Sequence, residues 1–103
     1  MWREGVLHAL GGGLWLHQFE LRGVRWAHLV SGDRDALLRA GDQLGMRAEW
    51  LQYRPIRHPG TGLREPAWHW DLRGPRLHLA LRLAAPRIPV VSRANDRGRS
   101  ISS

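Results

Sequence analysis

The stretch "VRWAHLVSGDRDALLRAGDQLG" (residues 24–45) combines two patterns that together set the expected fold. Residues 24–30 alternate in polarity, which is typical of a strand and places Trp26, His28 and Val30 on one face. Residues 31–45 then carry apolar side chains at helical spacing. Either Ser31 or Asp33 is expected to cap this helix, and Gly45 suits its left-handed end. The stretch therefore predicts a strand followed directly by a helix.

The flanking sequence extends this pattern on both sides. Before it, residues 14–21 predict a strand joined to the next by an Arg22-Gly23 turn, and residues 1–13 predict an N-terminal extension that ends in a flexible "GGG". After it, we expect a strand over 46–53, a long loop over 54–70, a helix over 74–85 and a short edge strand over 88–91. Residues 93–103 predict a basic disordered tail.

The element order β-β-α-β-α-β predicts a single small α/β domain over residues 14–92. Strands that alternate with helices favour a mainly parallel sheet, and the first hairpin adds an antiparallel edge to it. Among the tryptophans, Trp26 and Trp50 are expected in the core, whereas Trp68 and Trp70 are placed in the long loop.

Composition limits the classes of function. The 103 residues include sixteen arginines, no lysine and nine carboxylates, which gives a net charge of +7. This charge favours polyanionic partners, such as nucleic acid, nucleotides or an acidic protein surface. The absence of cysteine excludes disulfides and thiolate zinc sites and fits a reducing compartment. No stretch is apolar enough for a membrane span or a secretory signal, so a cytoplasmic location without membrane association is expected.

In a mainly parallel sheet, a ligand site is expected beyond the carboxyl ends of the strands. The long loop and the start of the last helix lie at this end, where arginines beside a helix N-terminus would attract an anion. We therefore predict a phosphate-binding set there, consisting of Gln52, Arg54, Arg57, Arg73 and Arg76. Candidate catalytic residues are His69, Asp71 and His28.

The segment "AWHWDL" (residues 67–72) has three interpretations. His69 could act as an acid or base while Asp71 holds its tautomer. The pair could also supply two metal ligands, with His28 or His58 as the third. In the structural interpretation, Asp71 binds backbone groups and His69 packs between Trp68 and Trp70. Spacing alone favours the structural interpretation, and no metal or cofactor is assigned. His8, His17 and His78 have no partner in the sequence.

Several short motifs resemble a small bacterial and phage family described as domain of unknown function 4031, over residues 14–92. The matching motifs are "RGVRWAHL" (22–29), Asp33, "LG" (44–45), "WLQ" (50–52), "HWDL" (69–72) and "AA" (84–85). The resemblance implies that His28, Gln52, His69 and Asp71 form one set, but it implies no activity. The chain departs from the family where His17 and Gln18 replace paired aspartates, and where Trp70 replaces a tyrosine.

Together, these observations predict a basic protein that binds a phosphate-bearing ligand, with nucleic acid or a nucleotide as the favoured class. The first alternative is a phosphoesterase-like hydrolase that uses His69 and Asp71. The second is a phage or bacterial protein-interaction module that binds an acidic partner and has no small-molecule site.

Overall fold

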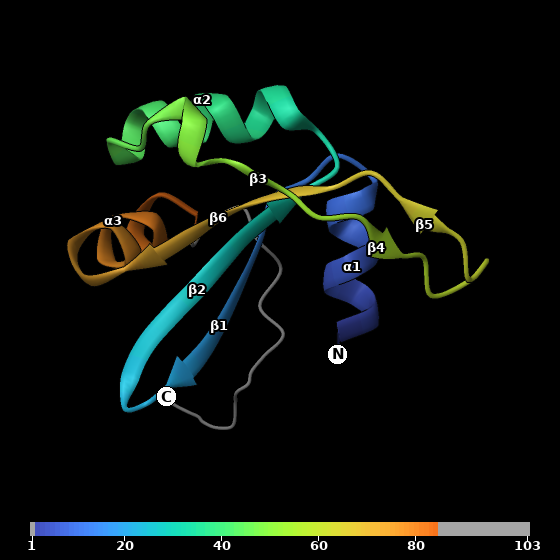
Figure 1. The fold of residues 1–103 in the computed structure, drawn as a ribbon, viewed down its shortest axis with the longest axis horizontal. Coiled ribbons are helices and arrows are strands. Elements are labelled where there is room, and N and C mark those ends of the chain that lie inside the picture. The colour runs from blue at the N-terminus through green and yellow to red at the C-terminus, as the bar shows by residue number, and fades with distance from the viewer. Residues whose placement is uncertain (1, 85–103) are drawn as a thin grey trace.

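The computed structural model describes residues 2–84. Three helices and six strands follow one another in this part of the chain (Figure 1). In chain order they are α1 (Trp2–Leu10), β1 (Trp15–Leu21), β2 (Val24–Ser31), α2 (Arg34–Leu44), the 3-10 turn η1 (Ala48–Trp50), β3 (Gln52–Tyr53), β4 (Ile56–Arg57), β5 (Arg64–Glu65), β6 (Trp68–Arg73) and α3 (Gly74–Ala84). The predicted strand over 88–91 and the predicted tail lie outside the described residues.

Residues 14–45 form the elements that their local pattern predicts. The turn between β1 and β2 is confirmed, since Arg22 and Gly23 both adopt left-handed backbone angles, with φ of 53° and 78°. Helix α2 is capped by the Asp33 carboxylate, which accepts a hydrogen bond from the Ala36 N–H at 3.1 Å. The helix ends at Gly45 with φ of 74°, as expected.

The predicted mainly parallel sheet is wrong. The main sheet has the strand order β1-β2-β6-β3, and every neighbouring pair is antiparallel. Strands β2 and β3 do run in the same direction, as expected for two strands joined through a helix. However, β6 lies between them and pairs with both. Strands β2 and β3 are therefore not neighbours, and no parallel pair forms between them.

The expected strand over 46–53 and the expected loop over 54–70 are both corrected. The first segment contains the turn η1, and only its last two residues form a strand, β3. Trp50 is 42% exposed instead of lying in the core. The second segment contains the small hairpin β4–β5, and its end is the start of the central strand β6. "AWHWDL" therefore lies largely in the middle of the sheet.

One face of the sheet is covered by α2 and α3. Leu29 of β2 and Leu72 of β6 pack there against the apolar stripes of the two helices. Trp70 is almost completely buried at this contact, and its indole N–H donates to the Leu37 carbonyl at 2.8 Å. A Cβ added to Gly41 would lie 2.5 Å from the Trp70 ring, so α2 approaches the strand closely because this position lacks a side chain.

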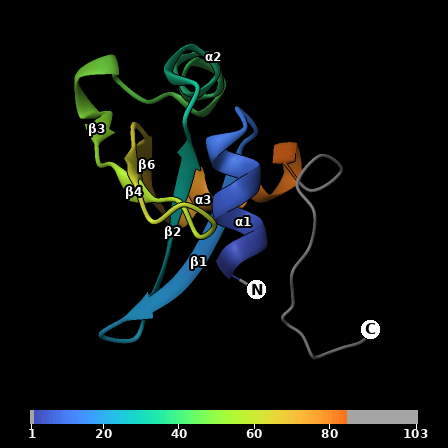
Figure 2. The same ribbon diagram turned by 90° about the vertical axis from the view of Figure 1, so that its right-hand side faces the viewer.

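The opposite face is covered at one end by α1 (Figure 2). Val6 and Ala9 of this helix pack on Trp15 and Val30, and Ile56 of β4 joins the cluster. Residues 2–10, which lie in the predicted extension, are thus packed against the sheet. The rest of this face, beyond α1 and the β4–β5 hairpin, is covered by no other helix or strand among residues 2–84; we call it the open face. None of the described helices has the length and apolar character needed to cross a bilayer.

Candidate functional site

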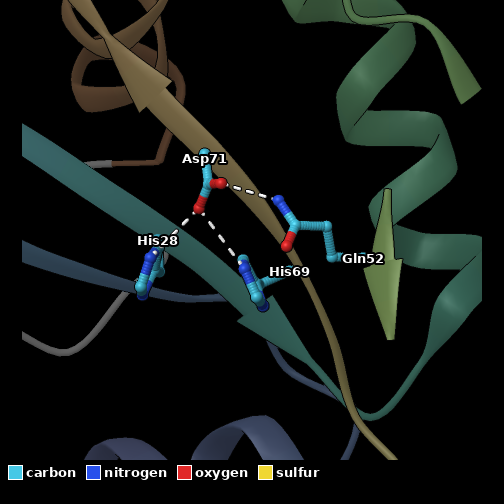
Figure 3. Close-up of polar contacts among 4 residues, drawn as sticks. All are labelled: His28, Gln52, His69 and Asp71. Atoms are coloured by element: carbon cyan, nitrogen blue, oxygen red, sulfur yellow. Dashed lines mark hydrogen bonds and ion pairs between the residues drawn. The ribbon is translucent and has the colours of Figure 1, made fainter. Parts of the chain in front are cut away.

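The register of three strands gathers four polar side chains on the open face, beside α1 (Figure 3). In β2 and β6, His28 is paired with Asp71 and Val30 with His69, while Gln52 of β3 is paired with His69 on the other side. Residues that are paired across antiparallel strands, or that lie two apart in one strand, point to the same side of a sheet. His28, Gln52, His69 and Asp71 therefore converge because of pairing between strands, and we call them the histidine–aspartate cluster.

The Asp71 carboxylate is the centre of this cluster. Its Oδ1 lies 3.1 Å from His28 Nε2 and 3.3 Å from His69 Nε2. Its Oδ2 accepts a hydrogen bond from Gln52 Nε2 at 2.6 Å. All three neighbours thus hold the carboxylate in one orientation, with a single oxygen shared by the two imidazoles.

The cluster has a buried floor and an accessible rim. The side chain of His69 is 7% exposed, whereas those of His28 and Asp71 are 35% and 39% exposed. The rings of the two histidines lie 4.5 Å apart. A ligand that approaches from solvent would therefore meet His28 and Asp71 first.

Burial makes the histidines less basic. Desolvation is the main cause that lowers the pKa of both His28 and His69. For His28 the neighbouring His69 adds to this effect, and the positive charge of Arg54 lowers the pKa of both, while Asp71 opposes the shift. Both imidazoles are consequently neutral at neutral pH, and a neutral imidazole can accept a proton or bind a metal ion.

A set of aromatic side chains that was not predicted from the sequence continues the cluster along the open face. His17 of β1 is the register partner of His28, and the ring of Trp2 lies 4.3 Å from that of His17. Phe19 lies 4.8 Å from His28 and is paired with Trp26. The two-residue turn at Arg22-Gly23 fixes this register and so places His17 beside His28. This turn was recognised in the sequence, so the pairing of the two histidines could have been predicted from it.

The predicted phosphate-binding residues are separated by the fold. Arg54 is close enough to affect both histidines, and Arg73 lies over the Trp26 ring at 5.0 Å on the open face. Arg57 instead donates to the Gly62 carbonyl inside the small hairpin. Arg76 lies on the side of the helices, over the Trp50 ring at 5.3 Å and 3.3 Å from the Gly45 carbonyl. The structure therefore does not bring the four arginines together.

The structure also bears on the structural and metal-ligand interpretations of "AWHWDL". His69 does not pack between Trp68 and Trp70, because strand alternation turns both tryptophans to the opposite face. His58 is engaged in its own loop, where its Nδ1 accepts hydrogen bonds from the Gly60 and Thr61 N–H groups. Of the two third ligands considered, His28 is the one that lies with His69 and Asp71.

The ligand atoms of His28, His69 and Asp71 all lie within 4.8 Å of one another, so this group has the spacing of a metal site as well as of an acid–base pair.

Comparisons of the chain with protein-family models, with curated proteins and with solved structures found no match.

Proposed function

We propose that the protein binds single-stranded nucleic acid on the open face of its sheet. The observation that carries the proposal is the set of partly exposed rings on this face, next to arginine side chains. Phe19 and Trp26 are half-buried neighbours across the β1–β2 hairpin, and His17 and His28 follow as the next pair on this face. Aromatic rings displayed on a four-stranded sheet offer stacking platforms for unpaired bases, as in known RNA-binding modules.

The charges on this face support the same ligand. Arg73 extends over Trp26, so a base stacked on that side of the sheet would have a guanidinium within reach of its phosphate. Arg54 supplies a second positive charge beside the histidines. The net charge of +7 adds a long-range attraction for any polyanion. Stacking and phosphate contacts together require no particular base sequence.

The test uses fluorescein-labelled single-stranded DNA and RNA, with a duplex for comparison, in anisotropy titrations at low and high salt. Phe19→Ala should weaken single-strand binding by about 5–150-fold, which corresponds to about 1–3 kcal/mol for one stacked base. Arg73→Ala should reduce the slope of log affinity against log salt by about one unit, because one phosphate contact is lost.

Arg76→Ala is the matched control. It also removes an arginine stacked on a tryptophan, but on the side of the helices, and it should leave affinity and salt slope nearly unchanged. The proposal fails if the wild-type chain does not bind single strands at low salt. It also fails if Arg76→Ala weakens binding as much as Arg73→Ala does.

A second candidate function is the hydrolysis of a phosphate ester at the cluster. It is favoured by the neutral His69, which Asp71 orients at 3.3 Å. In this reaction the histidine accepts a proton from water while the water oxygen bonds to phosphorus and the ester P–O bond breaks. The imidazolium then returns the proton to the leaving oxygen, which departs as an alcohol. Turnover of bis(p-nitrophenyl) phosphate that is lost in Asp71→Asn would support this function. Absence of turnover in the wild-type chain would exclude it for this substrate class.

Binding to an acidic protein partner remains the third candidate. It is distinguished by failure of both tests above, combined with a stable complex with an acidic protein in a pull-down experiment.

A further inference from the structure

We propose that His28, His69 and Asp71 bind one divalent transition-metal ion, and that Gln52 positions the carboxylate for it. The proposal rests on the cluster geometry and does not depend on binding of nucleic acid.

The spacing of the ligand atoms fits a metal ion. With ligand bonds of about 2.0 Å, a tetrahedral ion holds its ligand atoms about 3.3 Å apart, and an octahedral ion holds adjacent ligand atoms about 2.8 Å apart. Asp71 Oδ1 lies 3.1 Å from one imidazole nitrogen and 3.3 Å from the other. Small side-chain adjustments would therefore let one ion contact all three atoms.

The donor set selects the class of ion. Two imidazole nitrogens and one carboxylate oxygen suit zinc and the neighbouring first-row ions, whereas calcium and magnesium prefer ligand sets made only of oxygen. Three protein ligands also leave at least one coordination position free for water or another ligand. Since His28 and Asp71 form the exposed rim, this free position faces solvent.

The surroundings prepare the ligands for the ion. Gln52 donates to Asp71 Oδ2 and so directs Oδ1 toward the histidines, which is the usual task of a residue behind a metal ligand. The ligands come from two directly paired strands, so their backbone positions are fixed by the sheet.

One nearby charge affects what the ion would carry. The Arg54 backbone N–H donates to the Ala67 carbonyl at 2.8 Å, just before β6, so its positive charge lies near the cluster. This charge would repel a bare cation and would attract an anion at the free coordination position. The arrangement therefore favours a metal ion that holds an anionic group, of which phosphate is one example.

The test measures Zn²⁺ binding by isothermal titration calorimetry, with the full chain freed of any affinity tag, stripped with chelator and kept in phosphate-free buffer. We expect one ion per chain. His28→Ala and Asp71→Asn should each weaken binding by at least about tenfold, because each removes or weakens a ligand. Far-UV circular dichroism confirms that each variant is folded, and the exposed rim position of His28 favours folding of its variant.

His17→Ala is the matched control, since His17 lies beside His28 on the same face and is not a member of the proposed ligand set. It should change the Zn²⁺ affinity by less than about twofold. As a second readout, Co²⁺ should produce visible absorption bands in the wild-type and His17→Ala chains and not in His28→Ala. Equal Zn²⁺ affinities in the wild-type, His28→Ala and Asp71→Asn chains would overturn the proposal, as would an equal loss in His17→Ala.

Titration of the oligonucleotides in chelator and, separately, with added Zn²⁺ separates the two proposals. If Zn²⁺ binds as expected and no single strand binds with or without it, the metal site stands and the proposed function fails. If single strands bind and Zn²⁺ does not, the metal site fails alone.

Discussion

Replacement of Gly41 by alanine is expected to destabilise the protein, although alanine normally stabilises the interior of a helix relative to glycine. At an unconstrained helical position this change contributes about 1 kcal/mol of stability. Here the new Cβ would lie 2.5 Å from Cζ2 of Trp70 and 2.9 Å from Cε2. Overpacking of this kind costs about 1–3 kcal/mol. A shift of the ring would also weaken the 2.8 Å bond from its N–H to Leu37.

A weakened hydrogen bond adds about 1 kcal/mol to the overpacking cost and so offsets the helix gain of similar size, which leaves a net loss of about 1–3 kcal/mol. In a domain of this size this lowers Tm by roughly 4–8 °C per kcal/mol. The assay is urea denaturation followed by far-UV circular dichroism, because tryptophan fluorescence would change with the variants themselves.

The decisive comparison is between Gly41→Ala in the wild-type chain and Gly41→Ala in the Trp70→Phe variant. Phenylalanine lacks the part of the indole that meets the added Cβ, so Gly41→Ala should there recover its helix gain and become neutral or stabilising. The reasoning is refuted if Gly41→Ala stabilises the wild-type chain, or if it costs the same in both backgrounds. A refutation would mean that Trp70 does not fix the distance between α2 and the strand that carries His69 and Asp71.

Three further predictions concern the cluster and its support. The free energy of unfolding should fall as the pH is lowered from about 7.5 toward 5.5: the pKa values of His17, His28 and His69 are lowered in the folded state, so the unfolded chain takes up protons first. For buried His69 alone, the free energy of unfolding can change by at most about 1.4 kcal/mol per pH unit. Urea midpoints that stay constant between about pH 7.5 and 5.5 would contradict the lowered pKa values. Gln52→Ala should weaken Zn²⁺ binding by about tenfold and change Tm little, because the side chain is exposed and acts through Asp71. Titration calorimetry measures the first effect and thermal melts the second. A large fall in Tm with unchanged Zn²⁺ affinity would show a purely structural role. Gly5→Ala should destabilise the packing of α1, since the added Cβ would lie 2.1 Å from Trp15; unchanged hydrogen exchange of the α1 amides would count against this contact.

The sequence predicted the elements over residues 14–45 and the helix that begins at Gly74, whose patterns are local, but not the helix α1. Alternation in residues 24–30 and the cap at Asp33 identified β2 and α2, because both depend on neighbours a few residues away. The central position of β6 depends on pairing with β2 and β3, which are distant in the chain. Prolines and glycines over 54–66 made the whole segment resemble a loop, and the strand at its end was missed.

The residues of the candidate site were also predicted only in part. His28, Gln52, His69 and Asp71 were grouped as candidates from the sequence, and the structure brings them together. The arginines were grouped on the assumption of a parallel sheet whose strand ends meet at one edge. In the antiparallel sheet, Arg73 and Arg76 lie on opposite sides, although only two residues separate them.

The central place of β6 also has a consequence during synthesis of the protein. The β1–β2 hairpin can form once residue 31 has left the ribosome, but an isolated hairpin is only marginally stable. Until residues 68–73 emerge, the edge of β2 that later pairs with β6 is free to pair with another chain. A chain that is cut short before Trp68 should therefore aggregate through this edge instead of accumulating as a stable fragment.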